Sequence, residues 1–187
     1  MTIPCAMVRI TPEQAAAAAC AEHPDLITRI SWLIVPKLRR ETRLLQLSLF
    51  YCKYYIVWGT VSGPQGKCVR CTAAMNSALN LVRKVVGTPE TSDQDIDSGQ
   101  IVQDQYTIGQ AEEKIREFMV RSSYKMLRGL GRVSVECVET AYRPYYMCLC
   151  EKNGKIYRRV VDATLGERDY LLEYQYKHLK FLSAPTE

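Results

Sequence analysis

The sequence predicts an α+β protein built from two tandem units, each a helix followed by an antiparallel sheet. Two similar segments, residues 51–55 (Tyr-Cys-Lys-Tyr-Tyr) and 142–146 (Tyr-Arg-Pro-Tyr-Tyr), each lead into an apolar strand and then a glycine-containing turn. Upstream of each lies the same kind of helix start, Thr-Pro-Glu-Gln at 11–14 and Thr-Ile-Gly-Gln at 107–110. A helix-and-strands unit that occurs twice indicates internal duplication. We therefore expect the second unit to superpose on the first.

Composition and charge place an acidic segment between the two repeats. The chain has 187 residues, of which 47% are hydrophobic and 24% are charged, an ordinary globular composition. The net charge is +5, but residues 87–106 contain Asp and Glu and no Lys or Arg. We expect a first α+β repeat at 1–86, an acidic linker at 87–106, and a second repeat with a C-terminal tail at 107–187.

The N-terminal residues and the apolar runs bear on the location of the protein. The start, Met-Thr-Ile-Pro-Cys, has neither the basic nor the apolar region of a signal peptide. The most apolar short run, residues 32–35, is far too short to span a bilayer. These features predict a cytoplasmic protein without a membrane partner, and its eight cysteines are then expected to be reduced.

The first repeat is expected to begin with a helix. Thr11 is a suitable N-cap, a proline follows at the first helical position, and Gln14 completes a capping box. Alanines at 15–19 have high helix propensity and let another backbone approach closely. Pro24 should end this helix, because proline disfavours helical geometry in the residue before it. A second helix is expected at 25–35.

Strands follow in the first repeat. Residues 43–60 are rich in Tyr, Phe, Val, Ile and Trp, which strands prefer, and we expect two strands there with a turn or bulge near Lys53. A Gly- and Pro-containing turn at 62–66 then leads to a third strand at 67–74. Residues 79–86 are a candidate fourth strand.

The helix of the second repeat has clear boundaries in the sequence. Thr107 and Gln110 repeat the capping box, and apolar residues recur after them at helical spacing. Glycines at 129 and 131 are expected to stop this helix. The alternation of apolar and polar residues at 133–137 then predicts a half-buried strand.

A hairpin is expected in the second repeat. Strands at 145–150 and 156–161 are joined by an Asn-Gly pair at 153–154, which is the strongest short hairpin signal. After a further turn, residues 170–172 are expected to return as an edge strand. The tail is expected to be helical up to Leu182.

The second repeat resembles a known family. Its aromatic strand contains Tyr146, its hairpin ends in Asn-Gly-Lys-Ile-Tyr at 153–157, and Val-Val-Asp-Ala-Thr-Leu-Gly-Glu follows at 160–167. This order is similar to that of PepSY domains, over residues 107–172. The first repeat matches only through the duplication, because its turn at 73–78 lacks the Asp and the Gly. The resemblance implies a small α+β module, often an inhibitory or partner-binding unit in peptidase propeptides and cell-envelope proteins, and implies no catalytic residues.

Paired cysteines raise the alternative of a metal or redox protein. Cys68 and Cys71 form a CxxC pair and Cys148 and Cys150 a CxC pair, spacings at which thiolates can bind zinc or an iron–sulfur cluster. These cysteines lie in expected strands, where Cys68 and Cys71 would point to opposite faces. We favour packing, and expect free thiols with no bound metal and no other cofactor. The four are the candidate ligands if a metal is bound.

Enzyme activity and nucleic acid binding are both disfavoured by the sequence. The histidines at 23 and 178 lie in no recognisable nucleophile motif, and the glycines fall at hairpins and helix ends. Basic side chains cluster at 37–43 and at 116–132, but the aromatic signature of RNA-binding strands is missing and the acidic segment would compete for these charges. We therefore expect neither catalytic residues nor a nucleic acid partner.

The aromatic strands are apolar on both faces, and this pattern predicts an interface. An antiparallel sheet with one face in water should alternate with polar residues, and residues 145–150 do not. One face is expected to pack on the helix, and the other on the sister unit, a protein partner or a second copy. We expect partner binding at four tyrosines, a residue type that is enriched at interfaces: Tyr51, Tyr54, Tyr142 and Tyr145. The sequence thus predicts a non-catalytic interaction or assembly module, with a cysteine-based metal or redox protein and a peptidase-regulating protein as alternatives.

Overall fold

A computed structural model describes residues 1–21, 42–85 and 90–182 of the chain. The strands are β1 (Thr2–Ala6), β2 (Arg43–Ser62), β3 (Cys68–Asn76), β4 (Leu81–Lys84), β5 (Thr91–Asp95), β6 (Arg132–Lys152) and β7 (Lys155–Asp162). The helices are α1 (Pro12–Cys20), α3 (Ile108–Leu127) and α4 (Tyr170–Gln175), with short 3₁₀ helices η2 (Ser98–Gln100) and η3 (Tyr176–His178).

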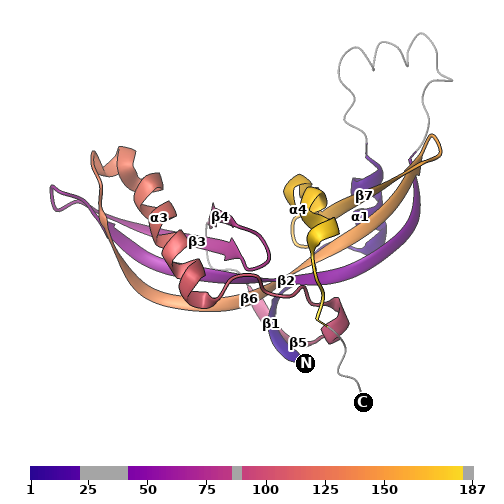
Figure 1. Cartoon of the computed structure of the whole chain (residues 1–187), viewed down its shortest axis with the longest axis horizontal. Coiled ribbons are helices and arrows are strands. Elements are labelled where there is room, and N and C mark those ends of the chain that lie inside the picture. Colours follow the sequence, from indigo (N-terminus) through magenta and orange to yellow (C-terminus); the bar gives the residue numbers. More distant parts are fainter. Residues whose placement is uncertain (22–41, 86–89, 183–187) are drawn as a thin grey trace, which may run out of the picture. The chain divides into compact units, whose positions relative to one another are not determined.

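The seven strands form one hydrogen-bonded sheet, and the described residues contain three α-helices, so the predicted α+β class is confirmed (Figure 1). The strand order is β4-β3-β2-β6-β1-β5, and β7 pairs with β6. The pairs β1–β5, β2–β3, β3–β4 and β6–β7 are antiparallel. In contrast, β1 and β6 run parallel where Cys5 lies beside Tyr142.

The chain divides into two compact units that differ from the tandem ranges expected from the sequence. The first unit consists of Met1–Met7, Tyr51–Arg143 and His178–Glu187, and the second of Val8–Phe50 and Pro144–Lys177. Strands β2 and β6 each contribute residues to both units. As a result, α1 belongs to the unit that contains β7, whereas α3 belongs to the unit that contains β3.

Helices α1 and α3 begin as the sequence predicts, with matching capping boxes. The Thr11 hydroxyl accepts the Gln14 N–H at 3.3 Å, and the Thr11 N–H donates to the Gln14 side chain at 2.8 Å. At α3 the corresponding distances between Thr107 and Gln110 are 3.4 Å and 3.0 Å. Each pair satisfies two backbone groups that a helix start leaves open. The second helix expected at 25–35 lies outside the described residues.

The expected break near Lys53 is wrong, because β2 is one strand from Arg43 to Ser62. Residue 53 is held in the strand by two partners from elsewhere in the first unit. Its C=O accepts the Ser77 N–H at 2.8 Å, and its ammonium group lies 2.8 Å from the Asp104 carboxylate. These contacts are distant in sequence, which is why local composition does not reveal them. The strands expected at 133–137 and 145–150 are likewise parts of one strand, β6.

Residues 90–106 of the acidic segment, the part that the structure describes, belong to the folded first unit. Strand β5 lies within it and pairs with the whole of β1, from Thr2 beside Asp95 to Ala6 beside Thr91. Further along, Ile101 is buried at 1% exposure and forms a bridge with β2. The segment therefore adds an edge strand and core side chains to the sheet.

The core of the first unit forms where α3 packs on β3. Its buried side chains recur every four residues, at Ala111, Ile115, Met119, Ser123 and Leu127, so they share one face of the helix. This face packs against apolar side chains of β2 and β3. Figure 1 shows α3 running along β3. Among the described residues, no helix is sufficiently long and apolar to cross a bilayer.

The core of the second unit forms where α1 packs on β6 and β7. Ala15 and Ala19 are fully buried against Cys148, Cys150 and Val161. Alanine has the smallest side chain that still favours a helix, so the strands can approach this helix closely. The alanine run thus packs on the strands through Ala15 and Ala19.

The hairpin of the second unit is confirmed, whereas the edge strand expected after it is wrong. Asn153 and Gly154 have φ values of 56° and 71°, as a two-residue type I′ turn requires. Residues 170–172 instead begin α4, because the Asp169 side chain accepts the Leu172 N–H at 3.0 Å and caps a helix. The helical tail expected up to Leu182 ends earlier, with η3 at residues 176–178.

Candidate interaction groove

The tyrosines expected at an exposed interface are mostly core residues. Tyr51, Tyr142 and Tyr145 are exposed at only 5%, 8% and 1%, and Tyr54 is half-buried. The expectation that these side chains form an accessible surface is wrong for the first three. They cannot be reached by a partner while the chain is folded as described.

Neighbours within each unit explain why these tyrosines are buried. Tyr145 stacks on Phe50 with 5.7 Å between ring centroids. Tyr142 lies beside Cys5 of β1, and burial raises the pKa of its phenol. The half-buried Tyr54 hydroxyl accepts a hydrogen bond from the Asn76 side chain at 3.2 Å. Aromatic strands with two apolar faces are thus covered by other parts of the same chain.

The four cysteines proposed as candidate metal ligands lie in strands, as expected. Cys68 is exposed and Cys71 is buried, so this pair does not converge on one point. Cys148 and Cys150 are fully buried, and burial raises their pKa values to about 12 and about 11. All eight cysteines are free thiols. In the described part of the chain, no three or more His, Cys, Asp or Glu side chains are grouped so that they could hold a metal ion.

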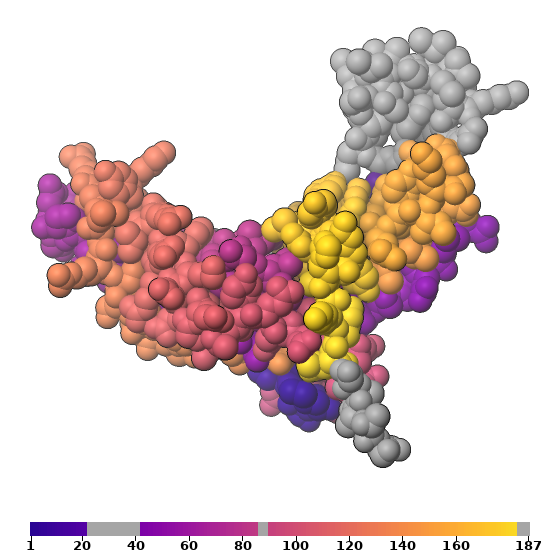
Figure 2. All heavy atoms as spheres, viewed as in Figure 1, coloured from indigo at the N-terminus to yellow at the C-terminus, as the bar shows by residue number. Residues whose placement is uncertain are grey.

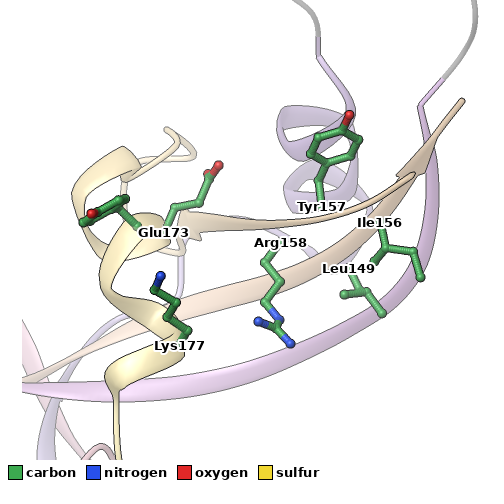
Figure 3. A pocket seen from close by; sticks show the side chains of 7 residues that line it. Leu149, Ile156, Tyr157, Arg158, Glu173 and Lys177 are labelled. Carbon is green, nitrogen blue, oxygen red and sulfur yellow. The ribbon is translucent and has the colours of Figure 1, made fainter. Parts of the chain in front are cut away.

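An open pocket lies between the β6–β7 hairpin and α4 in the second unit (Figure 3). Its volume is about 440 Å³. We call it the β7 groove. Four of its lining residues come from the hairpin and three from the helical segment: Leu149, Ile156, Tyr157 and Arg158, and Glu173, Tyr174 and Lys177. In Figure 2 the yellow surface of α4 lies directly beside the orange surface of β7.

The lining residues that come from the hairpin form one wall of the groove, which we call the strand wall, and they lie on both faces of the sheet at the edge of β7. Leu149 and Arg158 are paired across the two strands, so their side chains lie on the same face as that of Ile156. Tyr157 points to the opposite face, as Figure 3 shows. Ile156 is 63% exposed and Tyr157 is 43% exposed. A pocket lined from both faces of one strand lies at the edge of that strand.

A turn directly after β7 brings α4 to this edge. The Asp162 carboxylate accepts the Thr164 N–H at 2.8 Å, the Thr164 hydroxyl at 2.6 Å and the Leu165 N–H at 3.2 Å. Gly166 follows with a φ of 76°, a conformation that favours glycine. The Asp and Gly of the segment that resembles a PepSY ending therefore shape the turn that precedes α4.

Glu173 fixes α4 to β7. Its carboxylate accepts two hydrogen bonds from the Arg168 guanidinium, at 2.9 and 3.1 Å, and one from the Val160 N–H at 3.4 Å. The Arg168 guanidinium also lies 4.5 Å from the centre of the Tyr170 ring. Because Arg168 balances the charge of Glu173, this carboxylate adds little negative potential to the groove.

The remaining charges in the β7 groove are positive. Arg158 is exposed and makes no hydrogen bond or ion pair with any residue that the structure describes. Lys177 is exposed, and its ammonium group lies 5.8 Å from the centre of the Tyr174 ring. Tyr174 itself is 69% exposed. Exposed tyrosine and arginine side chains beside an exposed apolar one, here Ile156, are typical of protein interfaces.

Sequence reasoning missed every residue of this groove. A usable signal was present, since Tyr170, Tyr174 and Lys177 recur at helical spacing. The interpretation of residues 170–172 as a strand concealed it. Arg158 carries no local signal, because its importance depends on α4 lying beside it.

Comparison with known proteins gives no match, whether with family models, curated proteins or solved structures. The resemblance of residues 107–172 to PepSY domains therefore stays a prediction. The functional argument rests on the geometry of the chain itself.

Proposed function

We propose that this chain is a non-catalytic protein-interaction module, and that a partner protein binds in the β7 groove. The observation that carries the proposal is the exposure of large apolar side chains on the two walls of this pocket. Ile156 and Tyr174 are more than half exposed, at 63% and 69%. Burial of side chains of this size would contribute about 2 kcal/mol each to a complex.

Several features support tandem duplication as the origin of this module. Helices α1 and α3 share the same capping box and nearly the same N-cap φ and ψ, −77° and 162° against −76° and 163°. Long strands, β2 and β6, follow these two helices, and each is joined by a tight turn to an antiparallel partner. We propose that the two repeats exchange their helices, since α1 packs on β7 and α3 on β3.

The environment of the cysteines favours this function over a metal or redox role. Cys148 and Cys150 have pKa values raised to about 12 and about 11 by burial, so the reactive thiolate is scarce near neutral pH. Cys68 and Cys71 differ in exposure and point to different faces of β3. Packing explains the positions of Cys71, Cys148 and Cys150 without a ligand.

Site-specific photocrosslinking in the native cells tests the proposed function. A photoreactive phenylalanine analogue would replace Tyr174 in the groove, and in a matched control it would replace Tyr124 of α3. Tyr124 is comparably exposed, at 52%, but belongs to the first unit. We expect a discrete crosslinked protein from position 174 and none of the same mass from position 124.

A substitution at the same position measures how much the Tyr174 side chain contributes to the stability of the complex. Tyr174→Ser should weaken the captured complex about 30-fold, equivalent to about 2 kcal/mol, while the far-UV circular dichroism stays that of the native chain. Equal crosslinking from positions 174 and 124, or a complex unaffected by Tyr174→Ser, would contradict the proposal. The PepSY resemblance makes a peptidase one expected class of partner.

A further inference from the structure

The described residues of the chain cover only half of one edge of β7. On its inner side β7 pairs with β6 along its whole length, from Lys155 to Asp162. On its outer side, the Val160 N–H donates to Glu173 at 3.4 Å and the Val160 C=O accepts the Asp169 N–H at 2.9 Å. The Asp162 N–H likewise donates to the Glu167 C=O at 2.8 Å. Residues 167–173 thus occupy the outer edge of the C-terminal half of the strand.

The described residues leave the same outer edge open in the N-terminal half of β7. Backbone groups of a strand point alternately to its two sides, so residues 156 and 158 face outward as Val160 does. The hairpin gives the same assignment independently, because a two-residue turn makes Lys152 and Lys155 a hydrogen-bonded pair that faces inward. Within the described residues, no strand or side chain pairs with the outward N–H and C=O groups of Ile156 and Arg158.

The β7 groove lies beside these open backbone groups. Its strand wall contains Ile156, Tyr157 and Arg158, and its other wall is the helical segment with Tyr174 and Lys177. An unpaired strand edge is a template for a further strand. Here a wall with aromatic and basic side chains stands next to that edge, and these side chains could select what is added.

We propose that the outer edge of β7 at Ile156 and Arg158 binds an extended, acidic peptide segment of a partner protein by strand addition. This proposal rests on the proposed function and adds the mode of binding and the chemistry of the partner. Backbone hydrogen bonds to the strand edge would give affinity, and alternate side chains would give specificity. The peptide would lie as a third strand against the hairpin, with α4 beside it.

Charge and alternation define the expected peptide. On the face of Leu149 and Arg158, the Arg158 guanidinium, which has no partner among the described residues, and the nearby Lys177 ammonium would meet carboxylates. On the opposite face, Tyr157 would meet apolar side chains. Successive residues of the peptide should therefore alternate between Asp or Glu and aliphatic or aromatic residues, because a strand presents its side chains to two faces in turn.

A selection from a phage-displayed library of random dodecapeptides, with the full chain as target, tests this inference. We expect enrichment of peptides in which acidic and apolar residues alternate. Synthetic copies of the enriched peptides should then bind the wild-type chain in a fluorescence anisotropy titration. A library that yields no binder, or binders without acidic residues, would overturn the proposal.

Three variants distinguish the contribution of backbone hydrogen bonds to peptide binding from that of the side chains. Ile156→Pro removes an outward N–H and leaves the β6–β7 ladder intact, as edge positions allow, and it should weaken peptide binding at least about 10-fold. Ile156→Thr keeps the N–H and the branched shape and loses only apolar surface, so it should bind about 10-fold more tightly than Ile156→Pro. Arg158→Gln should weaken binding about 10-fold through the loss of a charge-assisted contact.

Changes in the peptide give a test that does not depend on the folding of variants. N-methylation of alternate residues removes donors from one edge of the peptide at a time. We expect one of the two methylated registers to lose binding at least about 10-fold and the other to retain it, because only one edge faces β7. Equal loss from both registers, or Ile156→Pro binding as well as Ile156→Thr, would overturn strand addition.

The outcomes distinguish this inference from the proposed function. Crosslinking from position 174 together with insensitivity to Ile156→Pro would mean that a partner binds to side chains and not to the strand edge. Peptide binding without any crosslink in cells would refute the proposed function and leave the open edge as a property of the fold. Concentration-dependent dimers that Ile156→Pro abolishes would make a second copy of the chain the occupant.

Discussion

Asp162 shows how one side chain prepares the candidate site. The residue is only 6% exposed, and its carboxylate accepts hydrogen bonds from the backbone and the hydroxyl of Thr164 and from the Leu165 N–H. The sequence alone marks this Asp through its resemblance to a PepSY ending, but not its purpose. In the structure, it closes the turn that returns the chain to the outer edge of β7. Its removal should therefore affect both stability and the groove.

We expect Asp162→Ala to lower the free energy of unfolding by about 1–3 kcal/mol, because the turn loses the three hydrogen bonds that the Thr164 and Leu165 donors make to this carboxylate. Asp162→Asn should cost less, since its amide oxygen can still accept from one or two of these donors. Urea denaturation of the three proteins measures the differences. An alanine variant as stable as the wild-type chain would show that the turn does not depend on this carboxylate.

For individual residues, sequence reasoning failed where it predicted that buried tyrosines lie at an interface. Tyr51, Tyr142 and Tyr145 have the composition of an interface, but their burial depends on neighbours that are distant in sequence, such as Phe50 and β1. Residue type alone does not separate a tyrosine in a core from one in an interface. For the thiols, strand alternation was sufficient to predict the different exposures of a CxxC pair.

At the scale of elements, the sequence predicted correctly those helix starts and turns that depend on interactions between neighbouring residues. Both capping boxes and the Asn-Gly hairpin are present, because each depends on residues within four positions of one another. The break expected in β2 and the strand expected at 170–172 are absent. In the first case Ser77 and Asp104 hold Lys53 in the strand, and in the second Asp169 starts a helix.

Two glycines that both have open space around them make a matched test of these backbone assignments. Gly154 has a φ of 71° in the type I′ turn, whereas Gly109 lies in α3, and nothing lies within 4 Å of a Cβ built at either position. Gly154→Ala should destabilise the chain by about 1 kcal/mol, because an L side chain disfavours the left-handed region. Gly109→Ala should instead stabilise it by about 0.5 kcal/mol through helix propensity.

Thermal or urea unfolding of the two variants measures this contrast, and neither change creates a steric clash that would complicate the comparison. Shifts of the same sign in both variants would mean that residues 153–154 do not form the described turn. In that event the register of β7, and the outward direction of residues 156 and 158, would have to be reassigned.

At the scale of the whole chain, the compact units do not follow the ranges of the two repeats expected from the sequence. Strands β2 and β6 each pass from one unit into the other without interruption. Sequence reasoning assigned each helix to the strands that follow it, whereas α1 packs on β7 and α3 on β3. That assignment could not be corrected from the sequence, because the capping signals that start a helix do not encode the strand on which it packs.

Because two strands run through both units, we expect the units to unfold in one transition. Pulsed thiol alkylation across a urea series, followed by peptide mass spectrometry, measures this. Cys71 is a buried probe in the first unit, and Cys148, with its pKa raised to about 12 by burial, is a probe in the second. Exposed Cys68 should be labelled at every urea concentration and serves as the internal control.

Coincident labelling midpoints for Cys71 and Cys148 are the expected result. Midpoints that clearly differ would show that each unit unfolds by itself, and that the shared strands do not couple them.

The raised pKa values of the Cys148 and Cys150 thiols make the stability of the fold depend on pH. They stabilise the fold below the ordinary pKa of a cysteine, and this stability is lost as the pH rises through about 11–12.

The central claim, an open strand edge in the β7 groove, is tested most directly by amide hydrogen exchange resolved for each residue of β7. In the free chain, the inward amides of Tyr157 and Arg159 should exchange slowly and the outward amides of Ile156 and Arg158 orders of magnitude faster. Addition of an alternating acidic peptide from the selection should slow the exchange of Ile156 and Arg158 alone. Equal protection of residues 156–159 in the free chain, or no change on addition of the peptide, would contradict the account.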